Sequence, residues 1–272
     1  MSVNRAHWNI LTDCNLSCGF CYLWRRPEAR VWTTAESLNL IKALSTRIEV
    51  LVFGGGDPLM RDDLIELVTF AKGVGLRVEM HTNAERIEEI DSIHLFQMLD
   101  RLGLSIDGED ELVHDAMRST NGNFQKCITA LNVAQMCGVR TTVRTLVTKR
   151  NVGRIHGIPR ILSAYPCVEK WSIRQFVPLG RGAKTEKFYD LGDDAFAKEA
   201  KSALEASSHY EISVVSKEDM TNCFCLITED GVFYGHPTDN AYKAVGKFPE
   251  ETLEKIFGRL TYNKRRGAEA YA

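Results

Sequence analysis

Three of the chain's eight cysteines, Cys14, Cys18 and Cys21, lie within eight residues in the spacing C-x3-C-x2-C. Three thiolates on one loop can bind a single metal centre. A structural zinc ion needs a fourth ligand, and neither His7 nor another cysteine stands at an obvious spacing for it. A [4Fe–4S] cluster held by three cysteines instead leaves one iron open to a non-protein ligand. The spacing therefore favours an iron–sulfur cluster, with a zinc site or inert thiols as the alternatives.

Two further polar segments each follow a run that is typical of a β-strand. The first, Gly-Gly-Gly-Asp-Pro at residues 54–58, directly follows the apolar residues 50–53. Its glycines let the main chain approach a ligand, and its aspartate can accept a hydrogen bond from an ammonium group. The second, Leu-Ser-Ile-Asp-Gly at residues 104–108, is followed by His114, Asp115 and Arg118. Each segment alone is also compatible with an ordinary turn.

Short β-rich runs alternate with amphipathic stretches along the chain. Residues 64, 67, 68 and 71, for example, are apolar at i, i+3, i+4 and i+7, which indicates one helix face. The predicted strands cover residues 8–11, 49–53, 77–81, 101–106, 141–147 and 170–177, and the predicted helices cover residues 34–47, 61–74, 86–99, 124–137 and 153–164. Repeated βα units predict an α/β fold with a parallel sheet, here a partial (β/α)6 TIM-like barrel. Functional loops in such a barrel follow the strand C-termini, where the motifs lie.

Composition and charge exclude several classes of protein. The 272 residues, 44% of them hydrophobic, are enough to bury a core. Because 34 Lys and Arg against 36 Asp and Glu give a net charge of −2, we expect no nucleic-acid partner. No apolar run approaches the ~20 residues that span a bilayer, and the N-terminus has no apolar signal core, so we expect a cytoplasmic protein without a membrane partner. The sequence contains neither a P-loop nor a G-x-G-x-x-G motif.

The cysteine triplet resembles the C-x3-C-x-aromatic-C signature of the radical S-adenosylmethionine (radical SAM) superfamily, with Phe20 as the aromatic residue. The resemblance implies one [4Fe–4S] cluster with Cys14, Cys18 and Cys21 as metal ligands and S-adenosylmethionine (SAM) chelated at the open iron. In this family an electron from the cluster cleaves SAM to a 5′-deoxyadenosyl radical, which abstracts hydrogen from a substrate. A reduced flavodoxin or ferredoxin-type partner would supply that electron.

The resemblance also implies roles for the other motifs. Residues 54–58 look like the family's Gly-Gly-Glu-Pro motif, which binds the SAM amino group, and residues 81–84 match a Thr-Asn-Gly position with alanine in place of glycine. Residues 104–118 are similar to a stretch in members that modify peptides. An inward-pointing Arg144 would pair with the SAM carboxylate. The cofactor-binding candidates are Phe20, Gly55, Gly56, Asp57, Asn83, Ser105 and Arg144, the substrate candidates are Asp107 and Arg174, and no catalytic acid, base or hydrogen donor is identified.

From about residue 180 the pattern changes to a small α+β extension. The sequence predicts a helix over 194–207, a strand over 210–215, a hairpin over 225–234 and a helix over 250–257. Residues 223–257 look like the SPASM or twitch extension, whose cysteines bind auxiliary clusters. Since no cysteine follows Cys225, Cys223 and Cys225 with His236 cannot supply the usual thiolate set, and we expect a degenerate, cluster-free cap. The expected domains are the barrel over 1–182, the cap over 183–262 and a flexible tail over 263–272.

Three functions remain open. The first is a radical SAM enzyme acting on a peptide or natural-product intermediate. The thirteen residues before Cys14 leave no room for a fused leader-binding domain, so we expect a separate partner to recognise any leader. The second is a viperin-like radical SAM enzyme acting on a nucleotide, because residues 170–176, including Arg174, resemble the corresponding viperin segment. The third is not an enzyme but a metal-stabilised structural or redox-sensing module. For an enzyme, the choice among oxidoreductase, mutase and lyase stays open.

Overall fold

The computed structural model describes residues 4–23, 29–206, 208–220, 225–238 and 241–260. Its strands form one ten-stranded sheet in the order β10-β9-β8-β1-β2-β3-β4-β5-β6-β7. They are β1 (Arg5–Asn9), β2 (Val50–Gly54), β3 (Arg77–Thr82), β4 (Arg101–Ser105), β5 (Thr141–Val147), β6 (Val168–Gln175), β7 (Glu211–Val215), β8 (Cys225–Ile227), β9 (Val232–Thr238) and β10 (Ala241–Lys247). Neighbours from β1 to β7 are parallel, β8 runs parallel to β1, and the pairs β8–β9 and β9–β10 are antiparallel.

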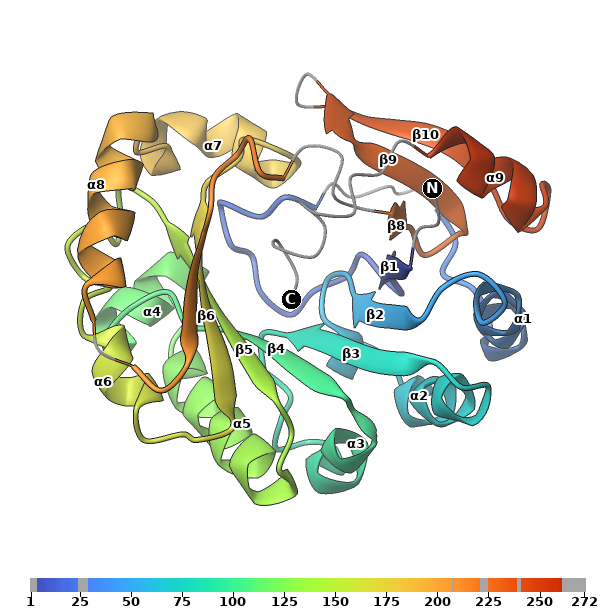
Figure 1. The fold of residues 1–272 in the computed structure, drawn as a ribbon, viewed down its shortest axis with the longest axis horizontal. Coiled ribbons are helices and arrows are strands. Elements are labelled where there is room, and N and C mark those ends of the chain that lie inside the picture. Colours follow the sequence, from blue (N-terminus) through green and yellow to red (C-terminus); the bar gives the residue numbers. More distant parts are fainter. Residues whose placement is uncertain (1–3, 24–28, 207, 221–224, 239–240, 261–272) are drawn as a thin grey trace.

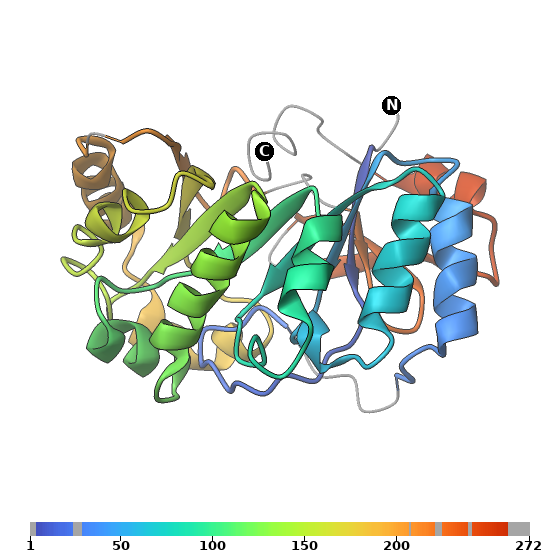
Figure 2. The same cartoon turned by 90° about the horizontal axis from the view of Figure 1, so that it is seen from below.

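The described residues also form helices, several of which cover the outer face of this sheet. They are α1 (Thr34–Leu44), α2 (Leu64–Gly73), α3 (Ser92–Met98), α4 (Glu111–Arg118), α5 (Asn123–Cys137), α6 (Ile158–Leu162), α7 (Arg181–Tyr189), α8 (Asp193–Leu204) and α9 (Leu253–Arg259), with a 3-10 turn η1 at Pro58–Met60. Figure 1 shows the sheet curved into an open barrel with α1, α2, α3 and α5 outside it, and Figure 2 shows these helices side by side. The α/β fold with a partial TIM-like barrel is confirmed. Among the described helices, none is long and apolar enough to cross a membrane.

Alternate residues of each strand face either the helices or the barrel interior. The outward residues, such as Phe53 on β2 and Met80 on β3, belong to the main hydrophobic core beneath the helices. The inward residues are largely polar and include His7, His81 and Arg144, which line a cavity. The two faces of the strands therefore differ in purpose: one stabilises the fold, and the other forms the wall of a site.

Some elements differ from the expectation. Helices α4 and α7 and strand β10 were not predicted. Helix α4 buries the apolar Val113 and Met117, but it spans only eight residues and also turns the polar His114 and Asp115 inward. Strand β7 pairs in parallel with β6 and adds a seventh parallel strand. The sheet thus continues past the expected boundary at residue 182, and β8 joins the cap to β1. The expected tail at residues 263–272 lies outside the described residues.

Candidate active site

The loop that follows β1 places three cysteines around one cavity. Cys14, Cys18 and Cys21 all line this cavity, whose volume is about 300 Å³. Cys18 is buried, whereas Cys14 and Cys21 are partly exposed. The backbone N–H of Cys21 donates to the carbonyl of Cys18 at 3.3 Å, so the last two cysteines share one tight turn.

Glycines in the turn after β2 allow the cysteine loop to pack against that turn. Gly55 has a φ of +123°, and a Cβ there would lie 2.2 Å from the carbonyl oxygen of Leu11. A Cβ on Gly56 would lie 1.7 Å from the carbonyl oxygen of Asp13, and the Gly56 N–H donates to Leu11 O at 2.9 Å. Since no side chain fits at either place, the glycines of this motif are needed for the close approach of two loops.

The surroundings of the thiols suit the ligands of an iron–sulfur cluster. Burial raises the pKa of all three thiols, to about 11 for Cys14. The Leu16 N–H donates to Cys14 Sγ at 3.4 Å, a contact that favours the thiolate formed when metal displaces the proton. Within the described ranges, no three His, Cys, Asp or Glu side chains are placed to hold one metal ion. Thiolates that bind different irons of one cluster do not need to converge on one point, so this donor set fits a cluster.

Helix α7 covers the cysteine loop from outside. Thr185 Oγ1 donates to the Gly19 carbonyl at 2.7 Å, and the ring of Tyr189 meets that of Phe20 edge-on with centroids 5.8 Å apart. A Cβ on Gly19 would lie 2.6 Å from Tyr189 Oη, so the glycine permits this packing. Because α7 is short and mostly polar, the sequence offered no sign that it would support the loop.

The carboxylate of Asp57 is fully buried and accepts hydrogen bonds from the protein itself. Its donors are Leu59 N at 2.9 Å, Thr82 Oγ1 at 2.8 Å and Asn83 N at 2.7 Å. Burial raises the pKa of Asp57 to about 6, against the effect of these hydrogen bonds. Asp57 was predicted among the cofactor-binding residues, but it does not line the cavity. Its side chain holds the turn after β3 in place.

Asn83 connects that turn to the cysteine loop. Its side-chain Nδ2 donates to Cys14 Sγ at 3.4 Å and to Asn15 Oδ1 at 3.0 Å. Its carbonyl accepts a hydrogen bond from Asn123 Nδ2 at 3.0 Å. Asn83 therefore lies where the end of β3, the cysteine loop and the start of α5 meet.

The motif after β4 forms a buried network. The Asp107 N–H donates to Nδ1 of His114 at 3.1 Å, and Nε2 of His114 lies 2.9 Å from Asn123 Oδ1. Because Nδ1 accepts, the proton is on Nε2 and the imidazole is neutral. Burial lowers the pKa of His114, in agreement with this assignment.

An ion pair joins this network to the cysteine loop. Arg118 Nη2 lies 2.6 Å from Asp107 Oδ2, and the side chains are 11% and 1% exposed, respectively. The Arg118 guanidinium also lies 5.2 Å from the centroid of the Phe20 ring. The main-chain carbonyl oxygen of Arg118 accepts a hydrogen bond from Cys18 Sγ at 3.6 Å. Arg118 therefore fixes the cysteine loop relative to the end of β4.

Gly103 in β4 makes room for Arg144 to point into the barrel, the orientation required by the sequence prediction. A Cβ on Gly103 would lie 1.9 Å from Arg144 Nη1 and 2.5 Å from Cδ2 of His81. Arg144 and Arg174 both line the cavity. The rings of His7 and His81 lie 5.4 Å apart on the same wall.

The structure thus gathers the predicted residues, apart from Asp57, around one cavity: Cys14, Cys18, Phe20, Cys21, Gly55, Gly56, Asn83, Ser105, Asp107, Arg144 and Arg174. Sequence reasoning assigned no site role to His7, His81 and Arg118, which also line it. A signal was present for the two histidines, because each lies two residues before an inward-facing asparagine, Asn9 or Asn83.

Cys225 of the extension faces away from this cavity. It is fully buried in the main hydrophobic core, and burial raises its pKa to about 12. The next residue, Leu226, lines the cavity, as alternation along a strand requires. Cys223 lies outside the described residues.

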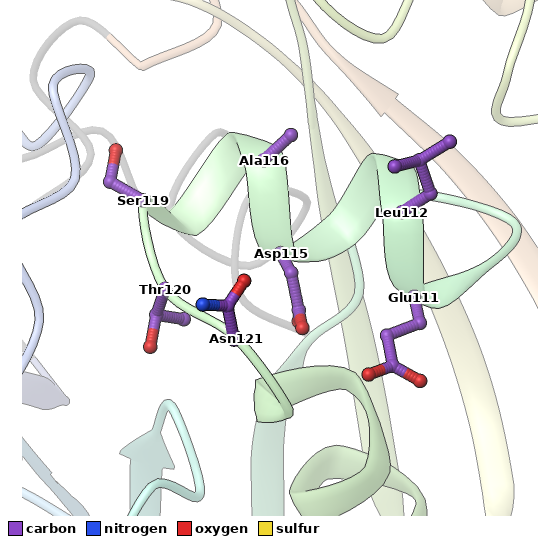
Figure 3. Close-up of a pocket in the computed structure, with 7 residues that line it drawn as sticks. All are labelled: Glu111, Leu112, Asp115, Ala116, Ser119, Thr120 and Asn121. Atoms are coloured by element: carbon purple, nitrogen blue, oxygen red, sulfur yellow. The ribbon is translucent and has the colours of Figure 1, made fainter.

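A second, open depression of about 640 Å³ lies beside α4 (Figure 3). Its lining consists of Glu111, Leu112, Asp115, Ala116, Ser119, Thr120 and Asn121. The Asp115 carboxylate accepts hydrogen bonds from the backbone of Gly122 and of Phe124, where it caps α5. Asp115, the buried acid of this lining, therefore holds the start of α5 in place.

Comparison with known proteins agrees with this geometry. Residues 8–156 match the model of the Radical SAM superfamily. An AdoMet-dependent heme synthase from Oleidesulfovibrio alaskensis is 30% identical over 185 residues, which are 65% of this chain and 46% of that protein. Mycofactocin maturase MftC from Mycobacterium tuberculosis is 31% identical over 193 residues, 68% of this chain and 47% of that protein. The chain spans about half the length of these curated relatives.

Solved structures share the fold over almost the whole chain. Streptococcus suis SuiB bound to the precursor peptide SuiA superposes with a TM-score of 0.71 and 14% identity, covering 98% of this chain and 66% of SuiB. Native anSMEcpe with bound AdoMet gives a TM-score of 0.71 and 15% identity, covering 98% of this chain and 82% of that protein. With the cysteine signature, the barrel and the family match in agreement, the chain belongs to the radical SAM superfamily.

Proposed function

We propose that the chain is a radical SAM enzyme that removes a hydrogen atom from a peptide or natural-product substrate. The observation that carries the proposal is that the three signature cysteines share one cavity with Gly55, Gly56 and the other residues predicted to contact SAM. When bound, a [4Fe–4S] cluster and SAM supply reductive cleavage of the sulfonium and a 5′-deoxyadenosyl radical. A peptide substrate is supported by the motif at residues 104–118 and by the similarity to SuiB, which was solved with a precursor peptide.

In this scheme Cys14, Cys18 and Cys21 hold one cluster and leave one iron for SAM. The main chain at Gly55 and Gly56, the Asn83 side chain, Ser105 and Arg144 bind SAM, with the Arg144 guanidinium paired to its carboxylate. Phe20 shields the cluster from water. Asp107 borders the cavity and positions the cysteine loop through Arg118, while Arg174 contacts the substrate. The partial barrel encloses the reacting groups and limits side reactions with water.

A reduced flavodoxin or ferredoxin-type protein supplies the electron, and the site of action is the cytoplasm. Residues 183–262 act as a cap that shapes the cavity and carries no auxiliary cluster, which is supported by the burial of Cys225 in the apolar core.

A nucleotide substrate, as in viperin-like enzymes, is the second candidate. It is favoured by Arg174 in the cavity wall, since guanidinium also binds phosphate.

The test is anaerobic incubation of cluster-loaded protein with SAM and dithionite. We expect 5′-deoxyadenosine to form, and to form faster with a peptide substrate than with nucleoside triphosphates. Nucleotide-dependent formation would select the second candidate. A protein that holds its cluster but never cleaves SAM would instead be a structural or redox-sensing module.

A further inference from the structure

Helix α7 and the loop after β5 form a basic surface on the outer side of the cysteine loop. The exposed basic residues of this surface are Lys149, Arg150, Lys184 and Lys187. Lys149 Nζ donates to the carbonyl of Lys187 at 3.3 Å, and the Lys149 N–H donates to the carbonyl of Tyr189 at 2.9 Å. The loop therefore lies against the end of α7, and the side chains of both segments belong to one surface.

An exposed aromatic ring lies within this basic surface. Phe188 is 51% exposed, and Lys187 Nζ lies 4.8 Å from the centroid of its ring. Lys184 stands one helical turn before Phe188, on the same face of α7. An aromatic ring bordered by charged side chains is typical of a surface that contacts another protein.

Tyr189 connects the basic surface to the cysteine loop. The centroid of its ring lies 4.9 Å from the Arg150 guanidinium and 5.8 Å from the centroid of the Phe20 ring. The Gly182 N–H donates to the carbonyl of Cys21 at 2.9 Å, so α7 also lies directly on a cysteine that is predicted to bind the cluster. The side chain of Tyr189 thus contacts both the exposed surface and the loop beneath it.

The charge of this surface differs in sign from that of the whole chain. Residues 149–150 and 181–190 include five basic and two acidic side chains, whereas the chain has a net charge of −2. A local excess of positive charge attracts a negatively charged protein to this one face and orients it there. The surface therefore suits an acidic partner that must approach the cysteine loop.

We propose, on the basis of the proposed function, that the basic surface docks an acidic flavodoxin that delivers the electron to the cluster. In this step the reduced flavin loses one electron and the oxidised cluster gains it. The exposed ring of Phe188 offers an aromatic contact to a flavin at the partner's surface, and the four basic side chains pair with the acidic residues around that flavin. Electron-transfer contacts are small and transient, so a surface of this size is sufficient.

The first test is anaerobic titration calorimetry of the full-length, cluster-loaded protein with a bacterial flavodoxin of negative net charge, at about 0.1 M salt. The charge-reversed variant is Lys184→Glu with Lys187→Glu, and the matched control is Lys42→Glu with Lys255→Glu. All four lysines are exposed, and both variants change the net charge by the same amount. Figure 1 shows α1 and α9, which carry the control lysines, on the other side of the molecule from α7.

We expect the variant in α7 to bind flavodoxin at least about tenfold more weakly than the unaltered chain, and the control to change binding less than about twofold, because charges much further apart than the Debye length of about 10 Å are screened. Raising the salt to about 1 M should remove most of this difference. Equal effects of the two variants, or binding of the unaltered chain that does not respond to salt, would overturn the proposal. If the double variant does not fold, Lys184→Glu alone should still weaken binding by at least about threefold.

The second test asks whether the docked flavodoxin delivers the electron. Flavodoxin hydroquinone is mixed with the oxidised cluster-loaded protein in the absence of SAM, and the absorbance of the flavin semiquinone is followed. We expect the variant in α7 to slow semiquinone formation at least about tenfold at low salt, and not to slow reduction by the methyl viologen radical cation. If flavodoxin binds this surface but reduces both variants equally fast, the surface serves another acidic partner and the proposal is wrong.

Two outcomes separate this proposal from the proposed function. A chain that accepts electrons from flavodoxin as expected but never cleaves SAM would refute the proposed function and leave the docking surface intact. A chain that cleaves SAM when reduced by methyl viologen, but neither binds flavodoxin nor takes an electron from it, would refute the docking surface alone.

Discussion

Replacing Arg118 by methionine leaves the carboxylate of Asp107 buried without its ion-pair partner. The two groups are 2.6 Å apart, and the Asp107 side chain is 1% exposed, so the carboxylate would lose its charged partner in a buried position. Breaking a buried pair on one side typically costs about 3–5 kcal/mol. Since domains of this kind are stable by roughly 5–15 kcal/mol, we expect a large fall in the free energy of unfolding. The cysteine loop should also loosen, because Arg118 packs over Phe20.

The assay is urea unfolding of the anaerobically handled protein, followed by circular dichroism, with iron content measured in parallel. Arg154→Met is the matched control, because Arg154 pairs with Glu109 at 2.6 Å but is 45% exposed, and such surface pairs contribute little. We expect Arg118→Met to lower both the urea midpoint and the iron bound, and Arg154→Met to change neither appreciably. If the two variants were equally stable, the buried pair would not support the site as described.

Three further outcomes are expected. Gly103→Ala should retain the fold but weaken SAM binding by at least about tenfold in equilibrium dialysis, because the new methyl group displaces the Arg144 guanidinium. An unchanged affinity for SAM would mean that Arg144 does not bind SAM. Burial lowers the pKa of His114 below its usual 6.5, so the unfolded chain takes up a proton below that pH that the native imidazole does not. Stability should therefore fall as pH drops from about 6.5 towards 5, and His114→Asn should flatten the dependence of the urea midpoint on pH; an unaltered slope would refute this. Cluster-loaded protein should contain about four irons per chain, and the same number in Cys225→Ser, whereas about eight irons would mean an auxiliary cluster.

The barrel could be predicted because its signal is local. The strand at Thr141–Val147 was predicted with the same bounds, since its outward residues alternate with inward ones. Helix α4 was not predicted, because it spans only eight residues and its inner face carries the polar His114 and Asp115 beside the apolar Val113 and Met117. Two apolar residues one turn apart are too short a pattern to predict a helix.

The candidate site likewise combines features that are local in the sequence with features that only the fold brings together. The cysteine spacing and the glycine turn are local and could be found in the sequence. The place of Asp57 could not, because it depends on donors from Thr82 and Asn83 on the neighbouring strand. The pairing of His7 with His81 likewise appears only when β1 and β3 are placed in one sheet.

The central claim is that the three cysteines hold a [4Fe–4S] cluster with one iron accessible to SAM. The most direct measurement is the electron paramagnetic resonance spectrum of the dithionite-reduced, anaerobically reconstituted protein, recorded before and after SAM is added. We predict a reduced-cluster signal that changes on addition of SAM and is lost in Cys18→Ser. A wild-type protein that binds zinc in place of iron, or whose cluster signal is unaffected by SAM, would contradict the account.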